Sequence, residues 1–126
     1  MSYQIKLLSW PDIGNHVIVI SRGAIDTTGL RELFARVGEV TRPLIDCKVL
    51  IDLEDAIYDL EQTEMDDIFD EIRPELWPPN LKIAIVACPT TTERDQLLAL
   101  STRLAKLGFT VSVFYGTKAA IDWLAE

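Results

Sequence analysis

The sequence predicts an α/β protein in which a mostly parallel, five-stranded sheet is covered by four helices. Four short apolar runs begin about 30 residues apart, which is the length of a strand plus a crossover helix. The segments between these runs repeat apolar residues at intervals of three and four, the periodicity of a helix with one buried face. This alternation is typical of parallel strands joined by right-handed crossovers.

Five segments are expected to form strands: 3–10, 16–20, 47–53, 81–87 and 109–114. The turn-forming sequence PDIGN joins the first two, which should therefore form a hairpin. Three of these segments, 16–20, 47–53 and 81–87, are rich in Val, Ile and Leu, as strands covered on both faces are. The last run, FTVSVF, alternates apolar and polar residues, which favours a place at the edge of the sheet.

Four helices complete the element order β-β-α-β-α-β-α-β-α. Three of them have an apolar face: Leu30, Leu33, Phe34 and Val37 in the first, Met65, Ile68, Phe69 and Ile72 in the second, and Leu97, Leu100, Leu104 and Leu107 in the third. The fourth lies in TKAAIDWLAE, with Thr117 as its expected N-cap. The prolines of RPELWPPNLK end the second helix and lead into the next strand.

Length and composition predict one globular domain over residues 1–126, with 48% hydrophobic and 25% charged residues. The net charge of −8 disfavours nucleic acid, whose phosphates require clustered Lys and Arg, and also disfavours anionic membrane surfaces. No apolar run approaches the ~18 residues of a membrane span, and the start of the chain does not resemble a signal peptide. We therefore expect a cytoplasmic protein.

The two cysteines, Cys47 and Cys88, are expected to be free thiols. One begins a predicted strand and the other ends the next, so parallel pairing would place them at opposite ends of the sheet. About six residues at ~3.3 Å each would separate them, which exceeds the ~7 Å limit for a disulfide.

The leading hairpin, the alternating units, VLIDLEDA on the third strand and the closing VSVFYGTKAAIDWL together resemble the SpoIIAA-like fold. STAS domains (sulfate transporter and anti-sigma-factor antagonist) share that fold. The chain is especially similar to stand-alone bacterial proteins of the STAS/SEC14 type. This resemblance covers nearly the whole chain and implies a small, non-enzymatic regulator or binding module with its strands in sequential order.

The phosphorylation segment of the family is altered in this chain. Anti-sigma-factor antagonists have an Asp-Ser-Ser-Gly-type segment after the third strand, in which a serine is phosphorylated. The corresponding stretch here reads YDLEQTEM and has neither Ser nor Gly. Glu61 stands near the usual serine position, and Thr63 is the expected phosphate acceptor.

The acidic stretch, residues 51–71, contains ten carboxylates and no Lys or Arg. A calcium loop is not predicted, because Ala56 and Ile57 stand where a ligand and a glycine are needed. A chain with one His also lacks imidazole ligands for zinc or iron, so we expect no metal and no cofactor. General acid–base catalysis needs a buried carboxyl. Only Asp52 ends a buried strand, and its expected role is to form the turn that follows.

Two interpretations of the acidic stretch remain open: a solvated helix and a docking surface. Its acids form like-charge pairs at spacings of three and four, and each pair costs a helix roughly 0.2–0.5 kcal/mol. A surface that steers a basic protein partner would explain this cost. The residues expected to contact such a partner are Asp59, Glu61, Thr63, Glu64, Asp67 and Glu71.

A second candidate site is CPTTTER, residues 88–94. Its Cys and Arg are spaced as in the phosphate loop of Cys-dependent phosphatases, where the thiolate attacks phosphorus and backbone N–H groups hold the oxyanion. Pro89 removes one such N–H, and Glu93 would repel phosphate. Thr90 and Glu93 more simply form a capping box for the following helix. One hypothesis is an anion site made of Cys88, Thr90, Thr91 and Arg94. A separate hypothesis is a phosphatase that uses Cys88 and Arg94.

The alternative function is a small-molecule or lipid-binding module of the SEC14-related type, with an apolar pocket beside the third or fourth strand. His16 has no Ser or acidic partner arranged around it and should be structural. Trp10, Trp77 and Trp123 are expected to pack in or around the core. The edge run FTVSVF invites pairing with a second copy, so a homodimer is a further expectation.

Overall fold

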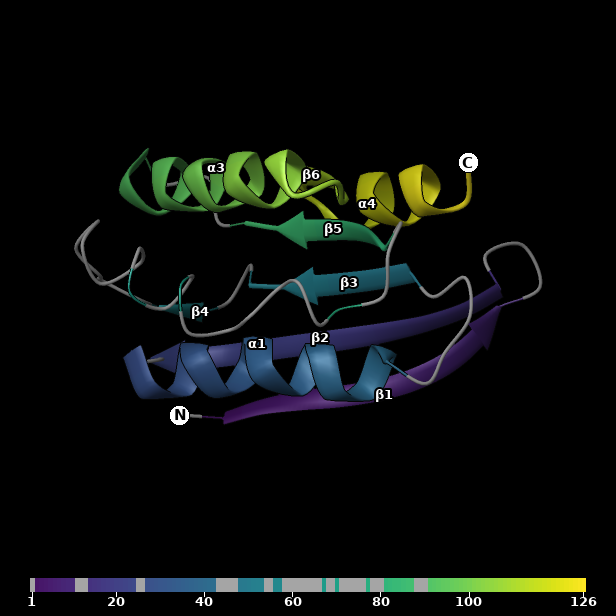
Figure 1. The fold of residues 1–126 in the computed structure, drawn as a ribbon, viewed down its shortest axis with the longest axis horizontal. Helices are drawn as coiled ribbons and strands as arrows, with labels where there is room; N and C mark the ends of the chain where they lie inside the picture. The colour runs from purple at the N-terminus through teal and green to yellow at the C-terminus, as the bar shows by residue number, and fades with distance from the viewer. Residues whose placement is uncertain are drawn as a thin grey trace.

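The computed structural model describes residues 2–10, 14–24, 27–42, 48–53, 56–57, 67, 70, 77, 81–87 and 91–126. The strands are β1 (Ser2–Trp10), β2 (Gly14–Ala24), β3 (Lys48–Asp52), β4 (Ala56–Ile57), β5 (Lys82–Val86) and β6 (Thr110–Phe114). The helices are α1 (Thr27–Thr41), α3 (Thr91–Lys106) and α4 (Thr117–Leu124). The sheet order is β1-β2-β3-β5-β6, and β4 pairs with β2 outside this path. Figure 1 shows α1 in front of the β1–β2 hairpin at the bottom of the view, and α3 and α4 at the top, beside β5 and β6.

The predicted N-terminal hairpin is confirmed. β1 and β2 are antiparallel, from Ser2 opposite Arg22 to Trp10 opposite Gly14. β2 is longer than the apolar run that predicts it, because backbone pairing with β1 continues past both ends of that run.

The predicted parallel pairing is also confirmed. β3 lies between β2 and β5, β6 follows β5, and all three of these pairs are parallel. The middle residues of β3 and β5 are buried, as expected of strands covered on both faces. The residues of β6 are exposed or half-buried and β6 ends the strand order, which confirms the predicted edge strand.

The expected count of five strands is wrong, because the short strand β4 makes the sheet six-stranded. β4 pairs in parallel with the last residues of β2, where Gly23 lies opposite Ala56. Partner residues are 32 positions apart in the β2–β3 pair and 33 apart in the β2–β4 pair. β4 therefore continues the line of β3 after one inserted residue, as a bulge does. β2 extends past the end of β3, and its last residues, Gly23 and Ala24, pair with β4. The sequence pattern does not reveal this extra length of β2.

Three helices lie in the described part of the chain, where the sequence predicts four for the whole. α1, α3 and α4 correspond to the first, third and fourth predicted helices. Of the second, only Asp67 and Asp70 are described, and both have helical backbone. The residues predicted to form its apolar face, Met65, Ile68, Phe69 and Ile72, lie outside the described residues.

The core occupies both faces of the sheet. The larger cluster joins α1 and α3 to one face, and the smaller cluster joins α4 to the other. Along β3, Val49 and Ile51 belong to the larger cluster and Leu50 to the smaller, because successive side chains of a strand point to opposite faces.

Most of the predicted apolar faces that can be checked are buried: Leu33, Phe34, Val37, Leu100 and Leu104. The prediction for Leu107 is wrong, since this side chain is 53% exposed. α3 ends at Lys106, and Gly108 has a φ of +102°, so the chain turns away before Leu107 can join the helical face. The side chains of Leu30 and Leu97 lie outside the described set.

Trp77 packs directly on α1 at Gly38. A Cβ built on Gly38 would lie 2.7 Å from Cδ1 of Trp77, so only glycine allows the indole ring to approach this closely. Trp77 is 5% exposed, and its ring centroid lies 5.6 Å from that of Phe109. The predicted packing role of Trp77 is therefore confirmed.

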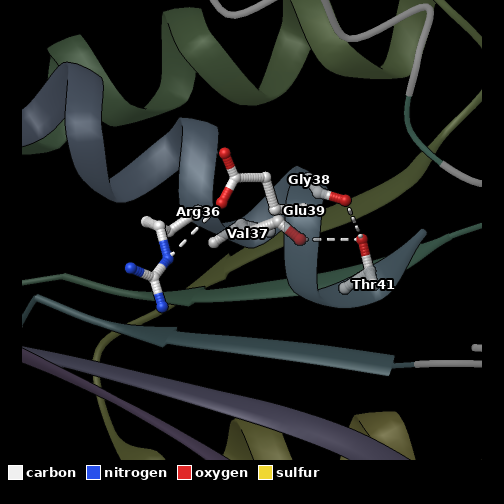
Figure 2. A network of polar contacts seen from close by, with 5 residues as sticks. All are labelled: Arg36, Val37, Gly38, Glu39 and Thr41. Atoms are coloured by element: carbon white, nitrogen blue, oxygen red, sulfur yellow. Dashed lines mark hydrogen bonds and ion pairs between the residues drawn. The ribbon is translucent and has the colours of Figure 1, made fainter. Parts of the chain in front are cut away.

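The C-terminal turn of α1 contains a fully buried polar side chain, Thr41. Its Oγ1 donates hydrogen bonds to the carbonyl oxygens of Val37 at 2.8 Å and Gly38 at 3.4 Å (Figure 2). The ion pair between Arg36 and Glu39, in the same view, joins two exposed side chains at 3.6 Å. The hydroxyl of Thr41 is thus satisfied within the helix, as burial requires.

The predicted N-cap of α4 is wrong by one residue. Gly116 occupies the N-cap with extended backbone and makes no side-chain cap bond, while Thr117 is the first helical residue. The chain enters the helix directly after the short turn that follows β6, one residue earlier than the sequence pattern indicates.

Candidate functional site

The strands that lead into the two sequence-predicted sites, β3 and β5, end side by side. β3 and β5 are parallel neighbours, and their last residues, Asp52 and Val86, lie opposite each other. The alignment continues beyond the strands, because Leu53 N–H donates to the Val86 carbonyl at 2.9 Å and Ala87 N–H donates to the Phe114 carbonyl at 2.8 Å. The acidic stretch follows β3 and CPTTTER follows β5, so both begin at the carboxyl ends of adjacent strands.

Three acids of the acidic stretch are described. Asp52 is half-buried at the end of β3, which is compatible with its predicted place after a buried strand. Asp67 and Asp70 have helical backbone and are exposed. A separation of three residues places them on the same side of a helix. At these two positions the acidic stretch presents carboxylates to solvent from a helical backbone.

One acid of the stretch has a cationic neighbour. Nη2 of Arg103 on α3 lies 3.3 Å from Oδ1 of Asp70. The two side chains are 33% and 72% exposed, so solvent screens the pair, which contributes at most about 1 kcal/mol. The contact places Asp70 beside α3. Sequence reasoning did not identify Arg103, since 33 residues separate the partners and no spacing rule links them.

The other predicted contact residues, Asp59, Glu61, Thr63, Glu64 and Glu71, lie outside the described residues. Cys47, Cys88 and Thr90 do as well. Thr91 and Arg94 lie in the first turn of α3, so the predicted helix begins within CPTTTER, but the side chains of these two residues are not among those described. The phosphate-acceptor, anion-site and free-thiol predictions therefore stay predictions.

Two searches of the described residues bear on function class. No group of three or more His, Cys, Asp or Glu side chains in that part of the chain could hold a metal ion. Among the same residues, no helix has the length and apolar character needed to cross a membrane. His16 lies in β2 between Leu8 of β1 and Lys48 of β3, and nothing is described of its side chain.

At the opposite, amino end of the sheet, two strand lysines contact the end of α4. Nζ of Lys48 donates to the Leu124 carbonyl at 2.6 Å, and Nζ of Lys82 donates to the Trp123 carbonyl at 2.7 Å. Lys82 also lies 4.5 Å from the centroid of the Trp123 ring, which packs on Phe114. Figure 1 shows the C-terminus beside the starting end of β5. These lysines place positive charge on carbonyl groups at the C-terminal end of α4, where the helix dipole favours a cation, and the Trp123 carbonyl also accepts from Glu126 N–H at 3.2 Å.

Comparisons with known proteins identify the fold. No protein-family model matches the chain, and no curated protein matches it either. Among solved structures, the chain is similar to an uncharacterised protein of the DUF3478 family with a SpoIIAA-like fold from Shewanella loihica PV-4. The match covers 97% of this chain and 93% of that chain, with a TM-score of 0.59 and 15% sequence identity. The chain is therefore a SpoIIAA-like α/β domain, as its sequence pattern predicts.

Proposed function

We propose that this protein is a non-enzymatic, cytoplasmic interaction module of the STAS type that docks a basic protein partner through the acidic stretch. The observation that carries the proposal is the exposure of Asp67 and Asp70, which both have helical backbone, together with the contact of Asp70 with Arg103 of α3. The absence of any Lys or Arg between residues 51 and 71 supports it. The SpoIIAA-like fold is compatible with such a module.

Electrostatics defines the expected partner. A concentrated negative surface speeds the association of a positively charged protein, and this effect weakens as salt screens charges beyond about 10 Å at 0.1 M. A phosphate on Thr63 would add further negative charge within the same stretch. Binding should therefore be fast at low salt and sensitive to charge reversal.

The test compares two triple charge reversals of equal size. The first changes Glu64, Asp67 and Glu71 to Lys, and the second changes Glu32, Glu39 and Asp122, which are exposed on α1 and α4. Each protein is used to capture partners from lysate of the native cell at low and high salt. We expect a stoichiometric partner that is retained at low salt by the wild type and the second variant and lost by the first. Equal retention by both variants, with unchanged circular dichroism, would contradict the proposal.

The non-enzymatic part of the proposal has its own test. Purified protein and the Cys88→Ser variant are assayed with p-nitrophenyl phosphate, which a Cys-dependent phosphatase hydrolyses through a phosphocysteine. We expect the same background rate from both. Turnover that disappears in Cys88→Ser would instead establish the enzyme hypothesis.

A further inference from the structure

Within the described part of the chain, no strand pairs with the outer side of β6. β6 ends the order of the described strands, with β5 on its inner side. Its pattern of one exposed and four half-buried residues contrasts with β5, where Ile83 to Val86 are buried. Natural edge strands are usually protected by a charge, a proline or a bulge. Thr110 to Phe114 contain neither a charged residue nor a proline, and they pair with β5 residue by residue without interruption.

The hydrogen bonds of β6 show which backbone groups face outward. On the β5 side, Thr110 N–H donates to the Leu81 carbonyl, and the Phe114 carbonyl accepts from Ala87 N–H. Backbone groups of a strand alternate in direction, so residues 110, 112 and 114 bond toward β5. The N–H and C=O groups of Val111 and Val113 point to the outer edge, where they can pair with an added strand.

The segment that contains β6, residues 96–121, has a net charge opposite in sign to that of the whole chain. Residues 96–121 contain no Asp or Glu, although the chain has 20 of them and a net charge of −8. Lys106 ends α3 four residues before β6, and Lys118 lies in the first turn of α4 four residues after it. Both lysines are exposed. β6 is therefore an uncharged strand with a cation near each end.

We propose that β6 binds an extended acidic peptide segment of another protein, which adds to the sheet as an outer strand. Backbone pairing at Val111 and Val113 would supply affinity, and acids at the two ends of the peptide would meet Lys106 and Lys118. Charge decides against a second copy of this chain. Antiparallel pairing of two β6 strands about Ser112 would bring Lys106 of one copy toward Lys118 of the other, between molecules that each carry −8. The proposal is independent of docking at the acidic stretch, which calls for a basic partner.

The test uses a fluorescein-labelled peptide of sequence DEVTVTVED, with KKVTVTVKK as its charge-inverted control, and measures anisotropy against the full-length protein at low salt. We expect the acidic peptide to bind at least about tenfold more tightly than the control and to weaken as salt rises. The double variant Lys106→Glu, Lys118→Glu should lose at least about tenfold in affinity, because both bracketing charges are inverted. Arg36→Glu, an exposed reversal on α1, is the matched control and should change affinity less than about twofold.

Val113→Pro separates backbone pairing from charge. Proline removes an outward N–H and leaves the hydrogen bonds toward β5 in place, as edge positions tolerate. Val113→Pro should lower the affinity for the acidic peptide at least about fivefold. If Val113→Pro does not fold, the double variant Lys106→Glu, Lys118→Glu provides the second test. Equal binding of the two peptides, no binding of the acidic one, or unchanged binding by the lysine variant would overturn the proposal. So would sedimentation showing a homodimer that dissociates in Val113→Pro.

Discussion

The hydroxyl of Thr41 makes a hydrogen bond within α1 at a fully buried position. Its bond to the Val37 carbonyl is 2.8 Å long, and the residue is 0% exposed. Thr102 on α3 makes the same type of bond to the Leu98 carbonyl at 2.9 Å, but it is exposed. The two residues form a natural pair for measuring the effect of burial on one hydrogen bond.

Thr41→Val should lower the free energy of unfolding by about 1 kcal/mol, because it removes a buried hydrogen bond while keeping the side-chain shape. Thr102→Val should change it by less than about 0.3 kcal/mol, since water competes for the bond in the folded protein. Urea denaturation followed by circular dichroism measures both. Equal losses in the two variants would show that the Thr41 bond has no special role.

At Gly38, one absent side chain decides the position of a distant residue. The indole of Trp77 occupies the space where a Cβ would stand, and it links α1 to Phe109, the residue before β6. A glycine inside a helix costs roughly 0.5–1 kcal/mol relative to alanine. The close packing of the Trp77 ring accounts for the glycine at position 38.

Helix α4 receives the cations at its C-terminal end from other elements of the chain. It has no basic residue in its own last turn. Lys48 and Lys82, neighbours in the register of β3 and β5, supply the cations instead. Positive charge at the C-terminal end of a helix is favourable, and hydrogen bonds from charged donors are stronger than neutral ones.

Lys48→Met and Lys82→Met should each destabilise the protein by about 1 kcal/mol, because the apolar stem is kept while the donor to an α4 carbonyl is lost. Hydrogen exchange of the α4 amides should increase more than that of β5. Lys118→Met is the control, since a cation in the first turn of the same helix does not favour it. Loss of stability in Lys118→Met as large as in the other two variants would contradict this assignment.

At the scale of the whole molecule, the charges are unevenly distributed along the chain. Half of the 20 carboxylates lie within residues 51–71, whereas residues 96–121 have none. Repulsion among the carboxylates of residues 51–71 opposes folding, and salt screens this repulsion. The described contact between Arg103 and Asp70 offsets only a small part of this repulsion because it is exposed.

Raising the sodium chloride concentration should therefore stabilise the protein, by about 1–2 kcal/mol between low salt and 0.5 M. The variant with Glu64, Asp67 and Glu71 changed to Gln should be more stable at low salt and should show a smaller salt dependence. Thermal unfolding at several salt concentrations measures both effects. A thermal unfolding midpoint that falls as sodium chloride is added would mean that attractive ion pairs contribute more to stability than the repulsion among carboxylates.

The chain by itself determined the parts of the fold that depend on local pattern. The hairpin, the parallel strands, the edge position of β6 and the buried faces of α1 and α3 follow from periodicity and turn residues, since these set which side chains can be buried together. The resemblance to the SpoIIAA-like fold followed from the same segments. The acidic stretch was visible as composition, but composition does not say which of its acids share a surface.

Only the tertiary structure decided the features that join distant residues. These features are strand β4, the pairing of Arg103 with Asp70, the contact of Trp77 with Gly38 and the two lysines at the end of α4. They connect positions 33 to 76 residues apart in sequence. No local pattern encodes such contacts, because each depends on how the sheet register brings element ends together. The same register aligns the carboxyl ends of β3 and β5 and puts β6 last in the order of the described strands.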